Sequence, residues 1–195
     1  MAVFKLEEEK KEKELRLLPS TDPRVMSSIA PWTDDLLKEH NFKDRKEVSD
    51  LMFKTMLRYG GIGLSANQVG LPFNMFVMGD HMSLENGLKL TCFNPMIIST
   101  SMETVVLKEG CLTYPFLFLS LARPRKVVVK YTDEKGDLKE GNLDGQMSRI
   151  FQHEYDHMIG RVFTELASKM KLDMARKKAT KSFKVWEART KLGKK

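Results

Sequence analysis

Two histidines four residues apart constrain this chain more than any other feature. They lie in the segment His153-Glu154-Tyr155-Asp156-His157. Histidines at this spacing lie on one face of a helix, so both imidazoles can bind one metal ion while the intervening glutamate reaches a water beside it. The segment therefore predicts a metal site on a helix.

The helix expected around this segment, from about Asn142 through Arg161, is amphipathic. At 100° per residue, His153, Glu154 and His157 fall in the same sector as its apolar residues. A carboxylate on an apolar face is costly unless a metal ion or a partner neutralises it. A buried histidine pair beside a helical ion pair is the alternative to a metal site.

A catalytic metal site usually takes three protein ligands and keeps one position open. Phe163 stands where the longer metzincin pattern has its third histidine, and His40 and His81 lie in weakly structured surroundings. Cys111 is the better candidate, because a thiolate is a good ligand for borderline divalent metals and Gly110 permits a close backbone approach. A small buried hydrophobic residue is the alternative interpretation of Cys111.

A glycine-rich segment, Gly61-Ile62-Gly63-Leu64-Ser65-Ala66-Asn67-Gln68, matches the relaxed dinucleotide fingerprint. That fingerprint requires a preceding strand, whereas this segment follows an expected helix over 45–59. Nucleotide binding is therefore weakly supported, and a plain glycine turn is the simplest alternative. Gln68 at its end supplies an amide donor that can face an oxyanion.

Between the two expected helices, short β-branched or aromatic runs alternate with turn residues, as in antiparallel strands and hairpins. The predicted strands are Phe73–Met78, Leu88–Phe93, Met96–Ser99, Thr104–Leu107 and Lys126–Thr132. The order of helix, short strands and helix predicts an α+β fold, with antiparallel strands and hairpins packed around a C-terminal metal-binding helix.

Charge divides the 195 residues into three parts. Residues 1–16 interleave both signs and predict a charged arm, and 17–167 predict one compact domain. Residues 168–195 carry a net charge of +9 against +7 for the whole chain, which predicts a basic tail or helix. With only Cys92 and Cys111, thiols or ligands are expected in place of a disulfide.

The apolar runs are far shorter than the roughly 20 residues that a membrane helix needs. The N-terminus has no apolar signal core and is too acidic for a transit peptide. We therefore expect no membrane association and a cytoplasmic location. A monomer is expected, since no strong interface signal appears.

Three segments, in this order, together resemble the motifs of the peptide deformylases. They are the segment that ends at Gln68, then Glu109-Gly110-Cys111-Leu112, then the segment from Gln152 to Gly160. The resemblance covers roughly 17–167. It implies a metal-dependent hydrolase that removes the formyl group from the N-terminal formyl-Met of newly synthesised polypeptides and releases formate.

The resemblance also implies a role for each motif residue. It makes Cys111, His153 and His157 the metal ligands, Glu154 the general acid and base, and Gln68 with the Leu112 amide the oxyanion site. Ile62, Gly63, Glu109 and Gly110 would line or support the substrate pocket. The family's preferred metal is Fe²⁺, and Zn²⁺, Ni²⁺ or Co²⁺ can also occupy such a site.

This chain departs from the family pattern in one apolar stretch, Phe116 to Leu121. Relatives tend to be polar there and often carry an arginine that contacts the substrate backbone. No such arginine is recognisable here unless Arg123 or Arg125 substitutes. The stretch is open to two interpretations, a core strand or a substrate-facing lip. Ser65 and Thr113 are milder departures, at positions where Ala and Ser are common.

The basic tail carries a loose apolar stripe among its cations from Lys171 to Leu192. A basic helix with aromatic residues can lie on ribosomal RNA, because phosphate neutralisation is strong and independent of sequence. Since deformylase substrates emerge from ribosomes, ribosome contact is one hypothesis for the tail. A solvated tail or a helix packed on the domain is the other.

Two other functions fit parts of the sequence. A small zinc endopeptidase would also use the His-Glu-x-x-His pattern, but its third ligand is missing downstream. A nucleic-acid-binding protein with a structural metal site would have a closed site and would need no base, so replacing Glu154 would leave its function intact.

Overall fold

The computed structural model describes residues 13–79 and 87–192. Of the predicted arm over 1–16, only residues 13–16 are described. His81 also lies outside the described residues. The helices are α1 (Asp35–Glu39), α2 (Arg45–Arg58), α3 (Gly145–Met158) and α4 (Lys169–Leu192), with short 3-10 turns η1 (Pro23–Met26), η2 (Ala66–Val69) and η4 (Phe163–Leu166). The strands are β1 (Gly63–Ser65), β2 (Met75–Gly79), β3 (Lys89–Thr100), β4 (Thr104–Cys111), β5 (Tyr114–Pro124), β6 (Lys126–Thr132) and β7 (Leu138–Asp144).

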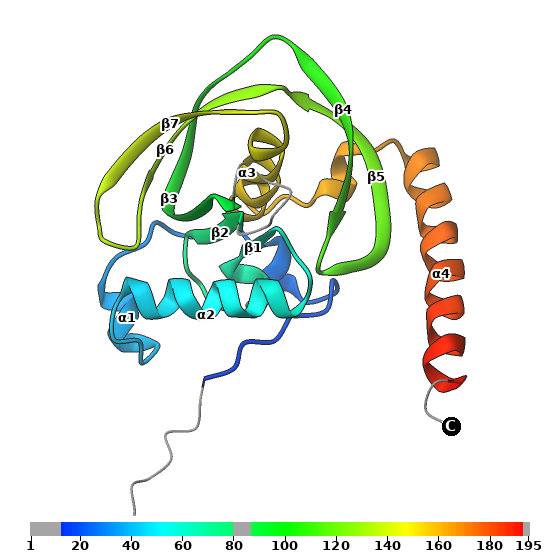
Figure 1. The fold of residues 1–195 in the computed structure, drawn as a ribbon, viewed down its shortest axis with the longest axis horizontal. Helices are drawn as coiled ribbons and strands as arrows, with labels where there is room; N and C mark the ends of the chain where they lie inside the picture. The colour runs from blue at the N-terminus through cyan, green and yellow to red at the C-terminus, as the bar shows by residue number, and fades with distance from the viewer. Residues whose placement is uncertain (1–12, 80–86, 193–195) are drawn as a thin grey trace, which may run out of the picture.

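The strands form one antiparallel sheet in the order β1-β2-β3-β6-β7 and a separate antiparallel hairpin of β4 and β5. Helix α3 lies inside the curve that these strands form (Figure 1). The predicted α+β class, with antiparallel strands around the histidine-bearing helix, is confirmed.

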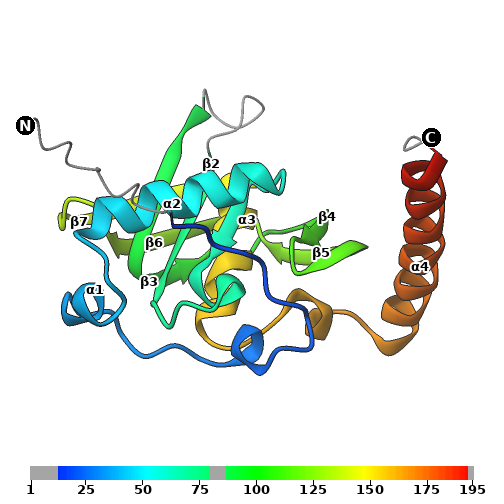
Figure 2. The same ribbon diagram turned by 90° about the horizontal axis from the view of Figure 1, so that it is seen from below.

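Strand β2 lies between helices α2 and α3 and is buried on both faces (Figure 2). Because successive side chains of a strand point to opposite faces, Met75 and Val77 pack into the cluster that includes α2. Phe76 and Met78 pack into the cluster that includes α3, where the ring centroids of Phe76 and Phe151 are 5.0 Å apart. The core thus fixes α3 against the sheet.

Helix α2 confirms the helix expected over 45–59. The side chain of its N-cap residue, Asp44, accepts a hydrogen bond from the backbone N–H of Glu47, which is the usual capping arrangement. The apolar stripe buries Val48, Met52 and Met56 against the sheet.

Helix α3 is shorter than predicted at both ends. Residues 142–144 belong to β7, where Asn142 pairs with Val128 of β6. The apolar spacing from Leu143 to Met147 fits a helix, but Leu143 reaches the same core from the strand. Gly145, with φ of +54°, marks the change of conformation at the start of the helix.

The two strands predicted over 88–99 form one irregular strand, β3. Its register with β6 shifts between Phe93 and Met96, because Asn94 has a φ of +48°. The Asn94 side chain bonds the backbone N–H and C=O of Trp32 and holds this irregularity in place.

Strand β5 contains the apolar stretch 116–121, for which the sequence left a core strand and a substrate-facing lip as alternatives. Leu117, Leu119 and Leu121 are buried, whereas Phe118 between them is half exposed. The stretch is therefore a core strand on one face, and its residues Phe116 to Phe118 also line the main cavity of the molecule, as expected for a lip.

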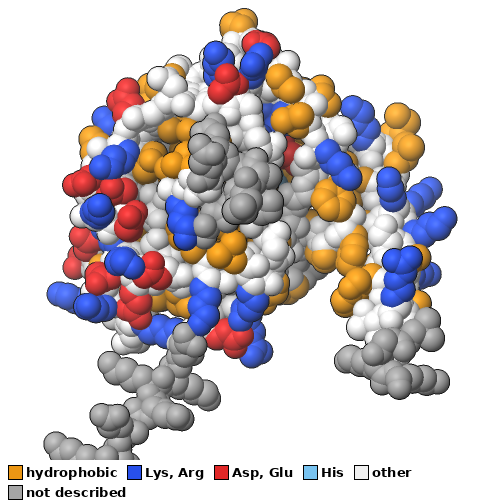
Figure 3. All heavy atoms as spheres, viewed as in Figure 1, with side chains coloured by type: hydrophobic (Ala, Val, Ile, Leu, Met, Phe, Trp, Pro, Cys, Tyr) orange, Lys and Arg blue, Asp and Glu red, His pale blue; other side chains and the backbone are white. Residues whose placement is uncertain are grey.

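Helix α4 stands beside the hairpin and packs against β5 (Figure 2). Its contact stripe, Leu172, Ala175 and Ala179, meets the cluster that contains Phe163 and the buried leucines of β5. Lys and Arg side chains cover the outer side of α4 (Figure 3). No helix within the described ranges is long and apolar enough to cross a membrane.

Candidate active site

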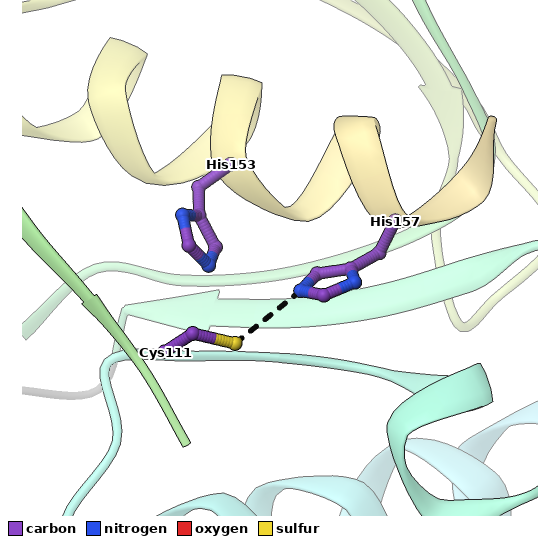
Figure 4. Close-up of side chains that lie close together, drawn as sticks. All are labelled: Cys111, His153 and His157. Carbon is purple, nitrogen blue, oxygen red and sulfur yellow. Dashed lines mark hydrogen bonds between the residues drawn. The ribbon is translucent and has the colours of Figure 1, made fainter. Parts of the chain in front are cut away.

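Cys111, His153 and His157 converge between the hairpin and α3 (Figure 4). One ligand atom from each lies within 4.8 Å of the others, and Cys111 Sγ is 3.5 Å from His157 Nε2. The two histidines come from successive turns of α3, and the cysteine is the last residue of β4. Residues far apart in the chain thus form one donor set.

A break in the hairpin register places the thiol over the helix. Gly110 pairs with Phe118, but the next residue, Cys111, pairs with Tyr114. Gly110 carries no side chain where a Cβ would lie 2.7 Å from Phe118 Cε1. This close packing of β4 on β5 sets the position of Cys111.

The donor set fits a single divalent metal ion. Tetrahedral ligands at about 2.0–2.3 Å from a metal lie roughly 3.3–3.8 Å apart, and the 3.5 Å between Cys111 Sγ and His157 Nε2 falls in this range. Burial disfavours the Cys111 thiolate, but the neighbouring His157 and His153 hold the thiol pKa well below its usual value. Burial also disfavours protonation of His153, yet Cys111 and Glu109 raise its pKa to about 10. The thiolate of Cys111 and the carboxylate of Glu109 therefore stabilise positive charge next to them.

The buried carboxylate of Glu109 contacts the imidazole of His153. Glu109 Oε2 lies 3.1 Å from His153 Nδ1, and the same carboxylate accepts hydrogen bonds from Arg123 and Arg149 at 2.6–3.0 Å. Burial alone would raise the pKa of Glu109, but His153 and the two arginines lower it to about 2. Arg123 also bonds Asp156 at 2.7 Å, so the charges are paired. This network orients the imidazole ring.

Glu154 is buried, with 4% of its surface exposed, beside the donor set. Ser65 Oγ donates a hydrogen bond to Glu154 Oε2, and Gly63 lies against the same carboxylate, where a Cβ would collide with it. Burial raises the pKa of Glu154, and the histidines on either side offset this only in part. A carboxyl group with a raised pKa suits proton transfer near neutral pH.

The Gln68 side chain also contacts the thiol. Its Nε2 is 3.2 Å from Cys111 Sγ and 2.9 Å from Thr113 Oγ1. Its Oε1 accepts a hydrogen bond from the Ser65 backbone N–H, which fixes the amide orientation. One N–H of the amide therefore points toward the donor set, and the other bonds Thr113.

A cavity of about 660 Å³ opens beside these groups. Of the ten residues to which the family resemblance gives a role, nine line it: Ile62, Gly63, Gln68, Glu109, Gly110, Cys111, Leu112, His153 and Glu154. His157 lies behind them and is almost fully buried. The Leu112 side chain packs against Gly61, where a Cβ would lie 2.6 Å from its Cδ1.

Neither arginine considered as a substrate contact faces this cavity. Arg123 is buried between Glu109 and Asp156, and Arg125 pairs with Glu103 and Asp144 at the surface. Neither side chain can contact a substrate in this cavity, so the suggestion that Arg123 or Arg125 replaces the family arginine is wrong.

The sequence interpretation missed several supporting residues. Ser65 and Thr113 were noted only as departures from a motif, yet they bond Glu154 and Gln68. Asn67 also escaped notice, and its Nδ2 bonds the backbone oxygens of Val25 and His157. Arg149 precedes His153 by one turn of α3, and this spacing was the only sequence feature that could have indicated its role.

The comparisons with known proteins agree on one family. A family model described as polypeptide deformylase matches residues 21–173. The peptide deformylase of Thermotoga sp. (strain RQ2) is 38% identical over 80% of this chain and 89% of its own length. That of Bartonella tribocorum is 38% identical over 82% of this chain and 94% of its own length.

Solved structures show the same similarity. The crystal structure of peptide deformylase from Ehrlichia chaffeensis matches with a TM-score of 0.73 and 32% identity, over 89% of this chain and 98% of that one. A plant peptide deformylase matches with a TM-score of 0.74 and 31% identity, over 92% of this chain and 94% of that one.

Proposed function

The chain belongs to the polypeptide deformylase family, and on that premise we propose how its own residues carry out the reaction. The protein is a hydrolase that removes the formyl group from the N-terminal formyl-Met of newly synthesised polypeptides. It uses a single metal ion. The convergence of Cys111, His153 and His157 beside Glu154 is the observation that supports the assignment of roles.

We propose that Cys111, His153 and His157 hold this ion, and that it is Fe²⁺, with Zn²⁺, Ni²⁺ or Co²⁺ able to replace it. One thiolate and two imidazoles suit these borderline metals better than Mg²⁺ or Ca²⁺. When bound, a divalent ion in such a site supplies Lewis acidity that lowers the pKa of a water molecule. Metal analysis after anaerobic purification identifies the ion.

Glu154 is the proposed general base and then the general acid. Its carboxylate takes a proton from the attacking water, which adds to the formyl carbon. The carbon–nitrogen bond then breaks, and Glu154 returns the proton to the departing amine. Formate and a free N-terminal Met result. The burial of Glu154 and its bond to Ser65 support this role, since both hold the carboxyl group beside the metal ligands.

Gln68 and the backbone N–H of Leu112 are the proposed oxyanion donors. Attack on the formyl carbon places negative charge on its oxygen, and a preorganised donor is typically worth about 3–4 kcal/mol there. Gln68 Nε2 already lies 3.2 Å from Cys111 Sγ. Leu112 follows Cys111 directly, in the turn between β4 and β5.

The substrate backbone is proposed to bind along β1 and the end of β4. β1 is an edge strand paired only with β2 among the described strands, and Ile62 and Gly63 line the cavity. An extended peptide can add to such an edge through main-chain hydrogen bonds. Gly110 lines the cavity from the other side. Glu109 supports the pocket from behind by orienting His153.

The catalytic domain is proposed to comprise residues 17–167, preceded by the charged arm over 1–16 and followed by the basic extension over 168–195. All the proposed catalytic groups come from one copy of the chain, so a monomer suffices, which light scattering tests. We infer that the protein acts in the cytoplasm of a bacterial-type cell, where formyl-Met polypeptides are made.

The outer face of α4 is the proposed ribosome contact. Its exposed cations include Lys177, Lys181 and Lys184. Reversing these three charges is expected to weaken ribosome binding and reduce its dependence on salt. Reversal of three exposed lysines of the catalytic domain, Lys38, Lys43 and Lys135, is the matched control. Equal binding by both triple variants would contradict the assignment.

Formate release from formyl-Met-Ala-Ser tests the proposed function. Activity that a chelator abolishes and that added metal restores is expected. The endopeptidase alternative predicts cleavage inside unformylated peptides, and the nucleic-acid-binding alternative predicts no turnover. No observation favours either alternative, since Cys111 lies with the two histidines and the site opens into a cavity.

A further inference from the structure

A second hollow, of about 480 Å³, lies between β5 and α4. Three of its lining residues, Lys108, Phe116 and Phe118, also line the catalytic cavity. The two hollows therefore adjoin at these three side chains. We call the second hollow the α4 groove.

An aromatic cluster adjoins both hollows through Phe116, which lines them both. The ring centroid of Phe116 lies 5.9 Å from those of both Phe183 and Trp186 on α4. The two α4 rings are 44% and 51% exposed, so this cluster is open to solvent. Hydrophobic side chains are visible on both sides of the boundary between α4 and the body (Figure 3). Exposed aromatic clusters of this kind are typical of binding surfaces.

The backbone is strained at the centre of the cluster. Phe116 has a φ of +64°, which a bulky residue rarely adopts. It lies in the irregular part of the hairpin, between Tyr114, which pairs with Cys111, and Phe118, which pairs with Gly110. Strained residues concentrate at functional sites, and bulges redirect side chains there. Here the bulge puts Phe116 between the cavity and α4.

The α4 groove is also cationic. Lys108 Nζ lies 4.5 Å from the centroid of the Phe118 ring, and Lys178 lines the groove from α4. Among the described residues that line it, none is acidic. Its combination of aromatic rings and lysines suits an extended peptide with apolar and acidic side chains.

We propose that the α4 groove binds the part of the nascent polypeptide that follows its formyl-Met end, and that it selects apolar and acidic side chains there. This inference rests on the proposed function, because the catalytic cavity delivers the chain to the groove. The groove adjoins the cavity that takes the formyl-Met end, so we assign to it substrate residues that follow those held in the cavity.

The test uses the metal-loaded full chain and formylated hexapeptides of the form formyl-Met-Ala-Ser-X-Ala-Ala, together with versions that carry X at the fifth or sixth position. X is Glu, Lys or Leu. The ratio of kcat/KM for the Glu and Lys peptides is measured on one preparation, so a loss of active enzyme cancels. We expect a ratio of about twofold to fivefold in favour of Glu at one or more positions, as for an exposed ion pair.

Lys178→Glu is expected to reduce or reverse this ratio, whereas Lys191→Glu, about 140° from Lys178 around α4 and outside the groove lining, should leave it unchanged. Replacing both Phe183 and Trp186 with Ala should remove the preference for Leu over Lys. Equal use of the Glu and Lys peptides by the unmodified protein would overturn the proposal, as would equal effects of Lys178→Glu and Lys191→Glu. Failure to turn over formyl-Met-Ala-Ser would instead contradict the proposed function.

Discussion

Ser65 Oγ donates a 2.5 Å hydrogen bond to Glu154 Oε2, which joins two residues 89 positions apart in the chain. Both side chains are buried, and the bond comes from the segment that also carries Gln68. A hydroxyl at this position therefore holds the carboxyl group that is proposed to transfer the proton.

Ser65→Ala is expected to lower kcat about tenfold and to change KM little, because a hydrogen bond to a charged group is lost while the cavity keeps its shape. Steady-state formate release measures both constants. Ser49→Ala is the matched control, since Ser49 is also buried and bonds Thr91 far from the site. Equal kcat values for the two variants would show that Ser65 does not position Glu154.

Gly63→Ala is expected to lower kcat/KM about 100-fold, since a Cβ at this position collides with the Glu154 carboxylate and displaces it. The same assay measures this loss, with circular dichroism to verify folding. Gly141→Ala is the control, because a Cβ at Gly141 meets no atom within 4 Å. A folded Gly63→Ala enzyme with full activity would contradict the placement of Glu154.

Cys111→Ser is expected to lose most of the bound metal, because an alcohol is a much poorer ligand than a thiolate for these ions. The metal content per chain is measured after identical dialysis. Cys92→Ala serves as the comparison, since Cys92 is fully buried in the core away from the site and its loss should leave the metal content intact. Retention of the metal by Cys111→Ser would exclude Cys111 as a ligand.

Glu109→Gln is expected to lower the free energy of unfolding by about 3–5 kcal/mol, because it leaves the buried Arg123 and Arg149 with one carboxylate fewer. It should also weaken metal binding about 10- to 100-fold through His153. Urea unfolding and metal titration measure the two effects. Glu103→Gln, which removes a surface partner of Arg125, should cost less than about 1 kcal/mol. Similar losses in both variants would argue against the buried network.

The metal-binding segment could be predicted because its chemistry is local. His153 and His157 share a helix face whatever the rest of the fold does, and their spacing alone places two ligands together. Cys111 could be nominated by its chemistry but not positioned, because a register break in the hairpin decides where its thiol lies.

The supporting network could not be predicted from one sequence. Arg123, Glu109 and Arg149 carry no spacing signal, since their contacts depend on how β4 and β5 fold over α3. The start of α3 was misjudged for a related reason: Leu143 faces the same core from a strand as it would from a helix. Non-local packing decided both cases.

The most direct test of the central claim compares the unmodified protein with Glu154→Gln at equal metal content, with formyl-Met-Ala-Ser as substrate and formate as the measured product. If Glu154 transfers the proton at a metal site held by Cys111, His153 and His157, the variant retains its metal and loses at least about 100-fold in kcat. A metal-loaded, folded variant that releases formate at the unmodified rate would contradict the account.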